Sequence, residues 1–153
     1  ADLDVDSLAF LNGLGLIERL ALGKDTLVLC HGVLDRDMHK IWPGTERTGI
    51  ERSKNFDDLL VQESPRFVVN GHIHYRTMID FEDCHLINAG TLRGERPAVT
   101  IFDTHQGLVV GYTMKYDSQM VRGATISLSE RDERRVWKNT QEFDGTWTPV
   151  VLS

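Results

Sequence analysis

The stretch Arg-Phe-Val-Val-Asn-Gly-His-Ile-His at residues 66–74 begins as an apolar run and ends in two histidines. A short continuous apolar run is typical of a strand buried on both faces, and we expect such a strand over residues 66–70. In extended backbone, side chains two residues apart point to the same side, about 6–7 Å from each other. His72 and His74 can therefore converge on one metal ion, or each can bind one ion of a pair. Gly71 lacks a Cβ, so other groups can approach the backbone there.

A second apolar run ends in a third histidine. Residues 26–30, Thr-Leu-Val-Leu-Cys, predict another buried strand, and His31 and Gly32 follow it directly. In open α/β sheets, ligands bind beyond the carboxyl ends of the strands. We therefore expect His31, His72 and His74 at one edge of one sheet, where three imidazoles suit Zn, Mn or Fe better than Ca or Mg. The alternative is three separate histidines, each with its own hydrogen bonds.

Three segments together carry a resemblance to a known family. Leu-Cys-His-Gly at 29–32, Val-Val-Asn-Gly-His-Ile-His at 68–74 and Ile-Asn-Ala-Gly-Thr-Leu at 87–92 resemble the C-terminal half of the calcineurin-like metallophosphoesterase domain. The resemblance covers residues 7–116 and implies an α/β fold, the C-terminal half of a metallophosphoesterase-type layered β-sandwich flanked by helices. In this family two divalent metal ions (Mn, Zn or Fe) activate a bridging hydroxide. The resemblance therefore implies a hydrolase whose substrate is a phosphate monoester or diester.

The resemblance also gives the histidines their roles. His31 matches the lone histidine of the fourth family motif and His72 the first histidine of the fifth, Gly-His-x-His, and both would bind the same metal. His74 would bind the other metal. Of the first three motifs, Gly-Asp-x-x-Asp and Gly-Asn-His do not occur in the chain. The Asp-x-His string at 103–105 is interpreted as a polar hairpin turn, and not as the first motif.

Without those motifs the ligand set for two metals is incomplete. We expect them to lie outside this chain, on a missing N-terminal segment or a second subunit, and we expect this chain alone to be inactive. Two alternatives stay open. One is a non-catalytic metallophosphoesterase-like binding module. The other is a mononuclear metal hydrolase that uses His31, His72 and His74 and keeps a fourth position open for water.

A few further residues are candidates for substrate contacts. Arg76 and Arg93, and also Arg96, follow the two motif turns and could hold a phosphate through bidentate contacts. The loop at 32–55 is expected to decide substrate identity, because long irregular loops are usually functional. Trp42 in that loop could line a substrate cleft or simply anchor the loop.

The remaining pattern predicts two helices, four further strands and a tail. We expect an amphipathic helix at 7–21 capped by Asp6 or Ser7, a helix at 56–63 capped by Asn55, and antiparallel hairpin strands at 77–81, 85–89, 97–103 and 108–116. His85 is interpreted as structural. From the resemblance we expect residues 1–116 to form the C-terminal portion of a metallophosphoesterase domain. We expect residues 117–153 to form an extension packed on it, with a short exposed helix at 130–135 and a strand at 146–152.

Composition limits the class of protein. The chain has 153 residues, a formal net charge of −6 and 41% hydrophobic residues, which is ordinary for one globular domain. The acidic balance gives no strong nucleic-acid signal. No apolar run reaches the about 18–20 residues that a membrane helix needs, so we expect a cytoplasmic protein without a membrane association. Cys30 and Cys84 are expected to be free thiols.

Overall fold

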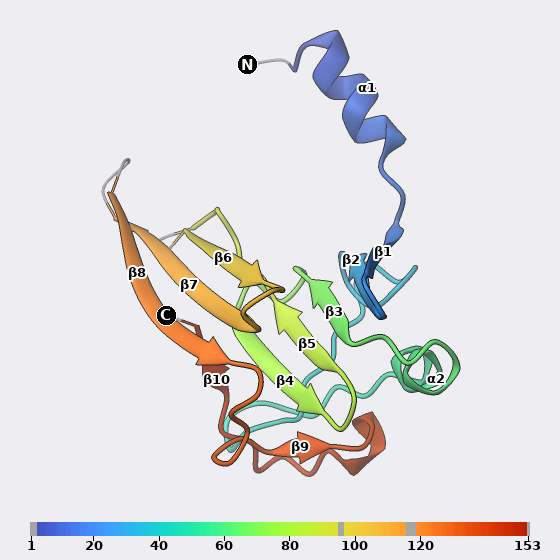
Figure 1. The fold of residues 1–153 in the computed structure, drawn as a ribbon, viewed down its shortest axis with the longest axis vertical. Helices are drawn as coiled ribbons and strands as arrows, with labels where there is room; N and C mark the ends of the chain where they lie inside the picture. Colours follow the sequence, from blue (N-terminus) through green and yellow to red (C-terminus); the bar gives the residue numbers. More distant parts are fainter. Residues whose placement is uncertain (1–2, 95–96, 116–118, 153) are drawn as a thin grey trace.

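The computed structural model describes residues 3–94, 97–115 and 119–152, which form two sheets (Figure 1). The larger sheet contains β1 (Ile17–Leu22), β2 (Asp25–Cys30), β3 (Phe67–Asn70), β4 (Thr77–Phe81), β5 (His85–Asn88), β9 (Val136–Trp137) and β10 (Val150–Val151). Its strand order is β1-β2-β3-β5-β4-β10, and β9 also pairs with β4. The smaller sheet contains β6 (Ala98–Asp103), β7 (Leu108–Lys115) and β8 (Gln119–Ser127), in that order.

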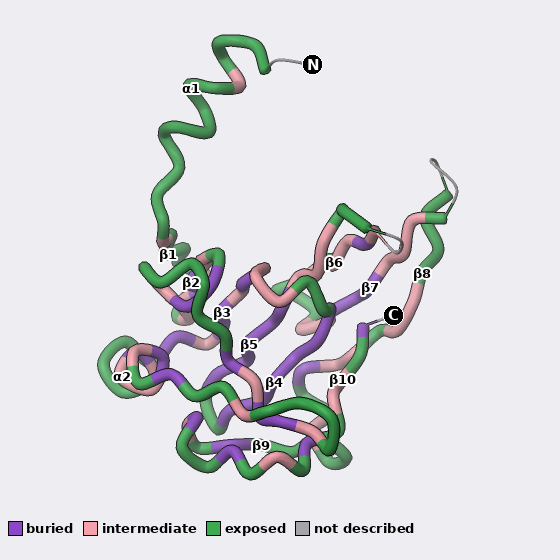
Figure 2. Tube along the Cα trace, turned by 180° about the vertical axis from the view of Figure 1, so that it is seen from behind, coloured by how far each residue is buried: buried purple, intermediate pink, exposed green. Residues whose placement is uncertain are grey.

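The central strands are buried on both faces because their side chains alternate between two hydrophobic cores. The core between the two sheets contains Leu27, Phe67, Met78, Ile87, Val109 and Leu128. The core on the opposite face contains Val28, Val68, Ile79, Leu86, Phe56, Leu59 and Trp137. This double burial explains the continuous apolar runs at 26–30 and 66–70, and it confirms the two predicted buried strands. Figure 2 shows the same strands as the buried centre of the molecule.

Strand direction brings the two histidine-bearing strand ends together. β2 runs parallel to β3, and β3 runs parallel to β5. The predicted strands at 77–81, 85–89, 97–103 and 108–116 are confirmed to within a residue or two at their ends, with Tyr116 outside the described residues. The β4–β5 and β6–β7 pairs are antiparallel, as expected for hairpins.

Helix α2 (Lys54–Gln62) covers the outer core with Phe56 and Leu59. The predicted helix is confirmed, but the expected cap at Asn55 is wrong. Ser53 is the cap, and its side-chain oxygen accepts from the amide of Phe56 at 3.3 Å. The reason is a distant contact, because the amide of Ser53 donates to the hydroxyl of Thr140 at 3.0 Å and so holds Ser53 in extended backbone.

The expected helix at 7–21 is wrong in its second half. Helix α1 (Val5–Gly13) is capped by Asp4, not by Asp6 or Ser7, and residues 17–22 form β1. Glycines at 13 and 15 weaken the helix, and a two-residue turn at Gly23 (φ 65°) then folds β1 back onto β2. α1 projects from the body and stays exposed, with Val5 at 80% (Figures 1 and 2). Within 3–94, 97–115 and 119–152, no helix is long and apolar enough to cross a membrane.

The strands after residue 118 pair with earlier strands. β8 pairs with the preceding strand β7, with a register shift between Val110 and Tyr112, while β9 and β10 pair with the distant strand β4. The expected helix at 130–135 is wrong, because this segment forms turns from which Arg131 and Arg134 reach the buried His85 and Asp80. The expected strand at 146–152 shrinks to the two residues of β10.

Candidate functional site

The candidate site lies where the parallel strands β2 and β3 end. His31 follows β2, and the Gly-His-Ile-His segment follows β3. The amides of Gly71 and His72 both donate to the carbonyl oxygen of His31, each at 3.0 Å. These two bonds continue the strand pairing past the sheet, so the backbone itself fixes His72 beside His31.

The side chains of His31 and His72 meet edge to face, with 5.4 Å between their ring centroids. Burial lowers the pKa of His72, and the nearby His31 and Lys40 lower it further. The neutral imidazole is the form that binds a metal, so this environment favours a ligand role. His74 lies next to the pair in left-handed backbone (φ 54°), and its amide donates to the carbonyl of Gly71 at 3.3 Å. A left-handed backbone is uncommon for a residue that is not glycine.

The donor set fits only part of a metal centre. Among the residues that the structure describes, no group of three or more His, Cys, Asp or Glu side chains is arranged to hold a metal ion. His31 and His72 come together, whereas His74 does not complete a three-ligand cluster with them. A structural or catalytic zinc takes three or four protein ligands. The arrangement therefore offers two neighbouring imidazoles and requires further ligands.

Two buried asparagines connect the strand ends near His31 and His72, a role that the sequence pattern did not predict. Asn70 and Asn88 end β3 and β5 as register partners. The Nδ2 of Asn88 donates to Oδ1 of Asn70 at 2.9 Å, and Nδ2 of Asn70 donates to the carbonyl of Gly32 at 3.1 Å. Oδ1 of Asn88 in turn accepts from the amide of Gly90 at 3.2 Å. The available signal was an asparagine at the end of each of two apolar runs.

The arginines near the motif turns have different surroundings. Arg76 is buried, and its guanidinium donates to the carbonyl of Tyr112 at 2.9 Å and to the hydroxyl of Thr113 at 2.8 Å. Arg76 thus ties the two sheets together, and a phosphate could reach it only after these bonds broke. Arg93 is exposed in the loop after β5, and Arg96 lies outside the described residues. Phosphate binding by Arg76 and Arg93 stays a prediction.

The Asp-x-His string at 103–105 forms the turn between β6 and β7. Oδ1 of Asp103 accepts from the amides of His105 and Gln106 at 3.0 Å and 2.9 Å. The carboxylate therefore closes a hairpin turn, which is the role that its sequence context predicts.

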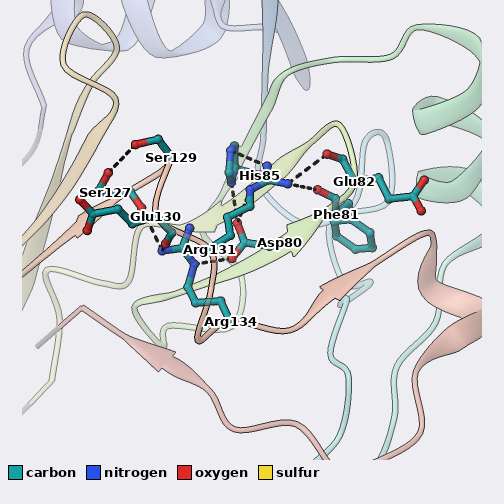
Figure 3. A network of polar contacts seen from close by, with 9 residues as sticks. All are labelled: Asp80, Phe81, Glu82, His85, Ser127, Ser129, Glu130, Arg131 and Arg134. Carbon is teal, nitrogen blue, oxygen red and sulfur yellow. Dashed lines mark hydrogen bonds and ion pairs between the residues drawn. The ribbon is translucent and has the colours of Figure 1, made fainter.

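A second polar cluster lies away from this edge, at Asp80 and His85 (Figure 3). Nη2 of Arg131 donates to Nε2 of His85 at 2.9 Å, so Nδ1 of the ring carries the proton that Asp80 accepts at 2.7 Å. Arg134 donates to the other carboxylate oxygen at 2.6 Å. Burial alone raises the pKa of Asp80, but the bonds from His85 and Arg134 outweigh it and leave that pKa lowered. His85 is thus structural, as its sequence context suggests.

Comparisons with known proteins give a fold and no close relative. No family model matches the chain, and no curated protein matches it. The zinc complex of Vps29 from Entamoeba histolytica superposes with a TM-score of 0.50 at 16% identity, covering 74% of this chain and 61% of that one. A hypothetical protein from Pyrococcus horikoshii OT3 superposes with a TM-score of 0.52 at 10% identity, covering 74% of this chain and 45% of that one. The chain thus spans less than two thirds of either protein.

The similarity agrees with the architecture described above, a mixed α/β structure with a central sheet and two helices. At these identities it concerns the fold alone. The chain shares its fold with the aligned part of the Vps29 structure.

Proposed function

We propose that this chain supplies part of the divalent-metal centre of a phosphoesterase that hydrolyses phosphate monoesters or diesters. The observation that carries the proposal is the contact between His31 and His72 at the ends of two parallel strands. Imidazole pairs of this kind suit Zn, Mn or Fe. In support, a protein of similar fold, the Vps29 of Entamoeba histolytica, has been crystallised with zinc.

The residues of this chain have distinct parts in the proposed centre. In the proposed centre, His31 and His72 bind one metal ion, and His74 binds a second. Asn70 and Asn88 orient the strand ends that carry the ligands. A bound metal would supply Lewis-acid activation of the phosphate and a nucleophile at neutral pH. The remaining ligands would come from a segment that carries the Asp-x-His, Gly-Asp-x-x-Asp and Gly-Asn-His motifs, in the same polypeptide or in another subunit.

Metal binding tests the assignment directly. Calorimetric titration of the full chain with Zn and with Mn should show a site that His31→Ala and His72→Ala each weaken by more than about tenfold, since even the loss of an outer partner of a ligand has that effect. His105→Ala is the matched control, because His105 is an exposed turn residue away from the edge. Unchanged affinity in both edge variants would refute the assignment.

Hydrolysis of nitrophenyl phosphate esters with added Mn separates the candidate functions. The proposal expects turnover when a segment with the three further motifs is supplied, and none from the chain alone. A second candidate, a non-catalytic binding module, is favoured by the incomplete ligand set among the described residues. It predicts no turnover in either case. A mononuclear hydrolase predicts turnover by the chain alone that His74→Ala abolishes.

A further inference from the structure

A cavity of about 500 Å³ opens beside the candidate metal edge. This volume lies within the usual range for small-molecule sites, about 300–1,000 Å³. Its walls come from the loop after β2, from the segment after β3 and from Pro149 just before β10, and they include Lys40, Trp42, Arg47, Ile73 and Tyr75. Ile73 lies between His72 and His74 in the chain. A ligand in this cavity would therefore contact the same segment that carries two of the candidate metal ligands.

One wall is an aromatic surface that the loop holds in place. Trp42 and Glu51 exchange two backbone hydrogen bonds of 2.9 Å and 2.8 Å. Nε1 of Trp42 also donates to the hydroxyl of Thr48 at 2.7 Å. The indole packs edge to face against both Trp147 and Tyr75, with centroid distances of 5.0 Å and 5.9 Å. Trp42 thus both anchors the loop and lines the cavity, which combines the two roles considered from the sequence.

Tyr75 contributes an aromatic side chain that the loop covers only in part. The residue keeps 43% of its surface exposed although it lies against Trp42. An exposed aromatic ring beside a fixed indole is suited to stack on a flat ligand at little entropic cost, because few rotatable bonds have to be ordered.

The cavity is cationic although the protein carries a net charge of −6. Lys40 and Arg47 line it, against the single carboxylate of Glu51. Nζ of Lys40 lies 3.6 Å from Oε1 of Glu51. Both side chains are exposed, so this ion pair restrains the lysine only weakly. Lys40 lines the cavity and is also close enough to His72 to lower its pKa, so this cationic side chain is near the histidines as well as the cavity.

We propose that this cavity binds the alcohol portion of an aromatic phosphate ester, such as a nucleotide or an aryl phosphate. The flat ring stacks on Tyr75 beside Trp42, and the phosphate lies toward Lys40 and the His31–His72 edge. The proposal deepens the proposed function, since it names the substrate class for that edge. Binding of the aromatic portion, however, needs no metal ion.

Calorimetry on the full chain in the presence of EDTA tests the cavity apart from the metal centre. AMP and phenyl phosphate should bind, and ribose 5-phosphate, which has no aromatic ring, should bind at least about tenfold more weakly because it lacks base stacking. The comparison of AMP with phenyl phosphate shows whether a nucleoside or a simple aryl group is preferred. Equal affinity for AMP and ribose 5-phosphate, or no binding of AMP, would overturn the proposal.

Variants locate the binding. Tyr75→Ala should weaken AMP binding by about tenfold, whereas Tyr75→Phe, the matched control that keeps the ring, should change it by less than about twofold. Lys40→Ala should weaken AMP binding but leave adenosine binding unchanged. No effect of Tyr75→Ala would contradict the assignment. If AMP binds through Tyr75 while His31→Ala and His72→Ala leave zinc affinity unchanged, the proposed ligand site in the cavity is supported and the proposed metal site is refuted. The reverse pattern refutes the cavity alone.

Discussion

Asn88 donates from Nδ2 to Oδ1 of Asn70 at 2.9 Å, across the parallel strands β5 and β3 and beneath the histidine edge. Both side chains are buried, so water cannot replace either partner. Through Asn70 the contact reaches the carbonyl of Gly32, the residue after His31. The two asparagine side chains therefore connect three strand ends, and they support the backbone bonds that fix His72 beside His31.

Asn88→Ala should lower the free energy of unfolding by about 1–3 kcal/mol, because Oδ1 of Asn70 is left buried without its donor. The same variant should weaken metal binding, since the end of β3 loses a lateral support. Urea unfolding followed by circular dichroism measures the first effect, and zinc calorimetry measures the second. Asn12→Ala, on the exposed face of α1, is the control and should change neither quantity. Wild-type stability in Asn88→Ala would mean that the asparagine contact does not support the fold.

Gly32→Ala should disturb the loop that follows His31. A Cβ at position 32 would lie 2.3 Å from the carbonyl oxygen of Asp37 and 2.5 Å from that of Arg36, so the backbone has to shift. Overpacking of this kind costs about 1–3 kcal/mol. We expect a lower urea midpoint and weaker metal binding. Gly13→Ala, where nothing lies within 4 Å of the added atom, should leave both unchanged or raise the midpoint slightly. Equal urea midpoints for Gly32→Ala and Gly13→Ala would contradict the close approach of Gly32 to the carbonyl oxygens of Arg36 and Asp37.

The histidine edge was predictable from sequence because each apolar run is buried between two cores and ends in a histidine. Residues 26–30 and 66–70 alternate between those cores, and no other local structure buries both faces of a five-residue run so well. The expected helix at 7–21 was wrong in its second half. Leu8, Leu11, Leu14 and Ile17 recur at spacings of three and favoured a helix. Residues 17–22 instead pair with β2 over six residues, and that pairing outweighs local propensity.

The features of the fold that the sequence did not predict depend on contacts between residues that are distant in the sequence. β9 and β10 are two residues each and exist only because β4 provides their partner. The charged segment at 130–135 resembled an exposed helix, yet Arg131 and Arg134 reach the buried pair of Asp80 and His85. The asparagine contact likewise requires the register of β3 and β5. Local periodicity contains none of this information, because long-range pairing decides it.

Thiol chemistry should distinguish Cys84 from Cys30. Burial raises the pKa of the Cys84 thiol to about 12, so almost no thiolate forms at neutral pH. Both cysteines are free. A chromogenic disulfide reagent should therefore find two thiols in the denatured, unreduced protein, and Cys84 should stay unreactive in the folded protein. Cys84→Ser should remove one of the two denatured equivalents and leave the native reaction unchanged. Rapid native labelling of Cys84 would contradict its burial.

The stability of the protein should depend on pH through His85. Burial lowers the pKa of this imidazole below its ordinary value of 6.5, and the hydrogen bond to Asp80 offsets the effect only in part. Protonation would also break the bond that Nε2 accepts from Arg131. Between the lowered pKa and 6.5, the unfolded chain binds a proton that the folded chain does not. The contribution of His85 is therefore fully present above pH 6.5 and declines as the pH falls below it.

Urea unfolding at several pH values between about 7.5 and 5 measures this slope. The glutamine side chain in His85→Gln cannot take up a proton, so this variant should lose less stability on acidification. Its amide can still donate to Asp80, but the loss of the imidazole ring should make the variant less stable than the wild type at neutral pH. His72, whose pKa is also lowered, gives both proteins the same background slope. His105→Gln, in the exposed turn after β6, should keep the wild-type slope. Identical slopes for wild type and His85→Gln would mean that the pKa of His85 is the same in the folded and the unfolded chain, which would contradict the lowered pKa in the folded protein.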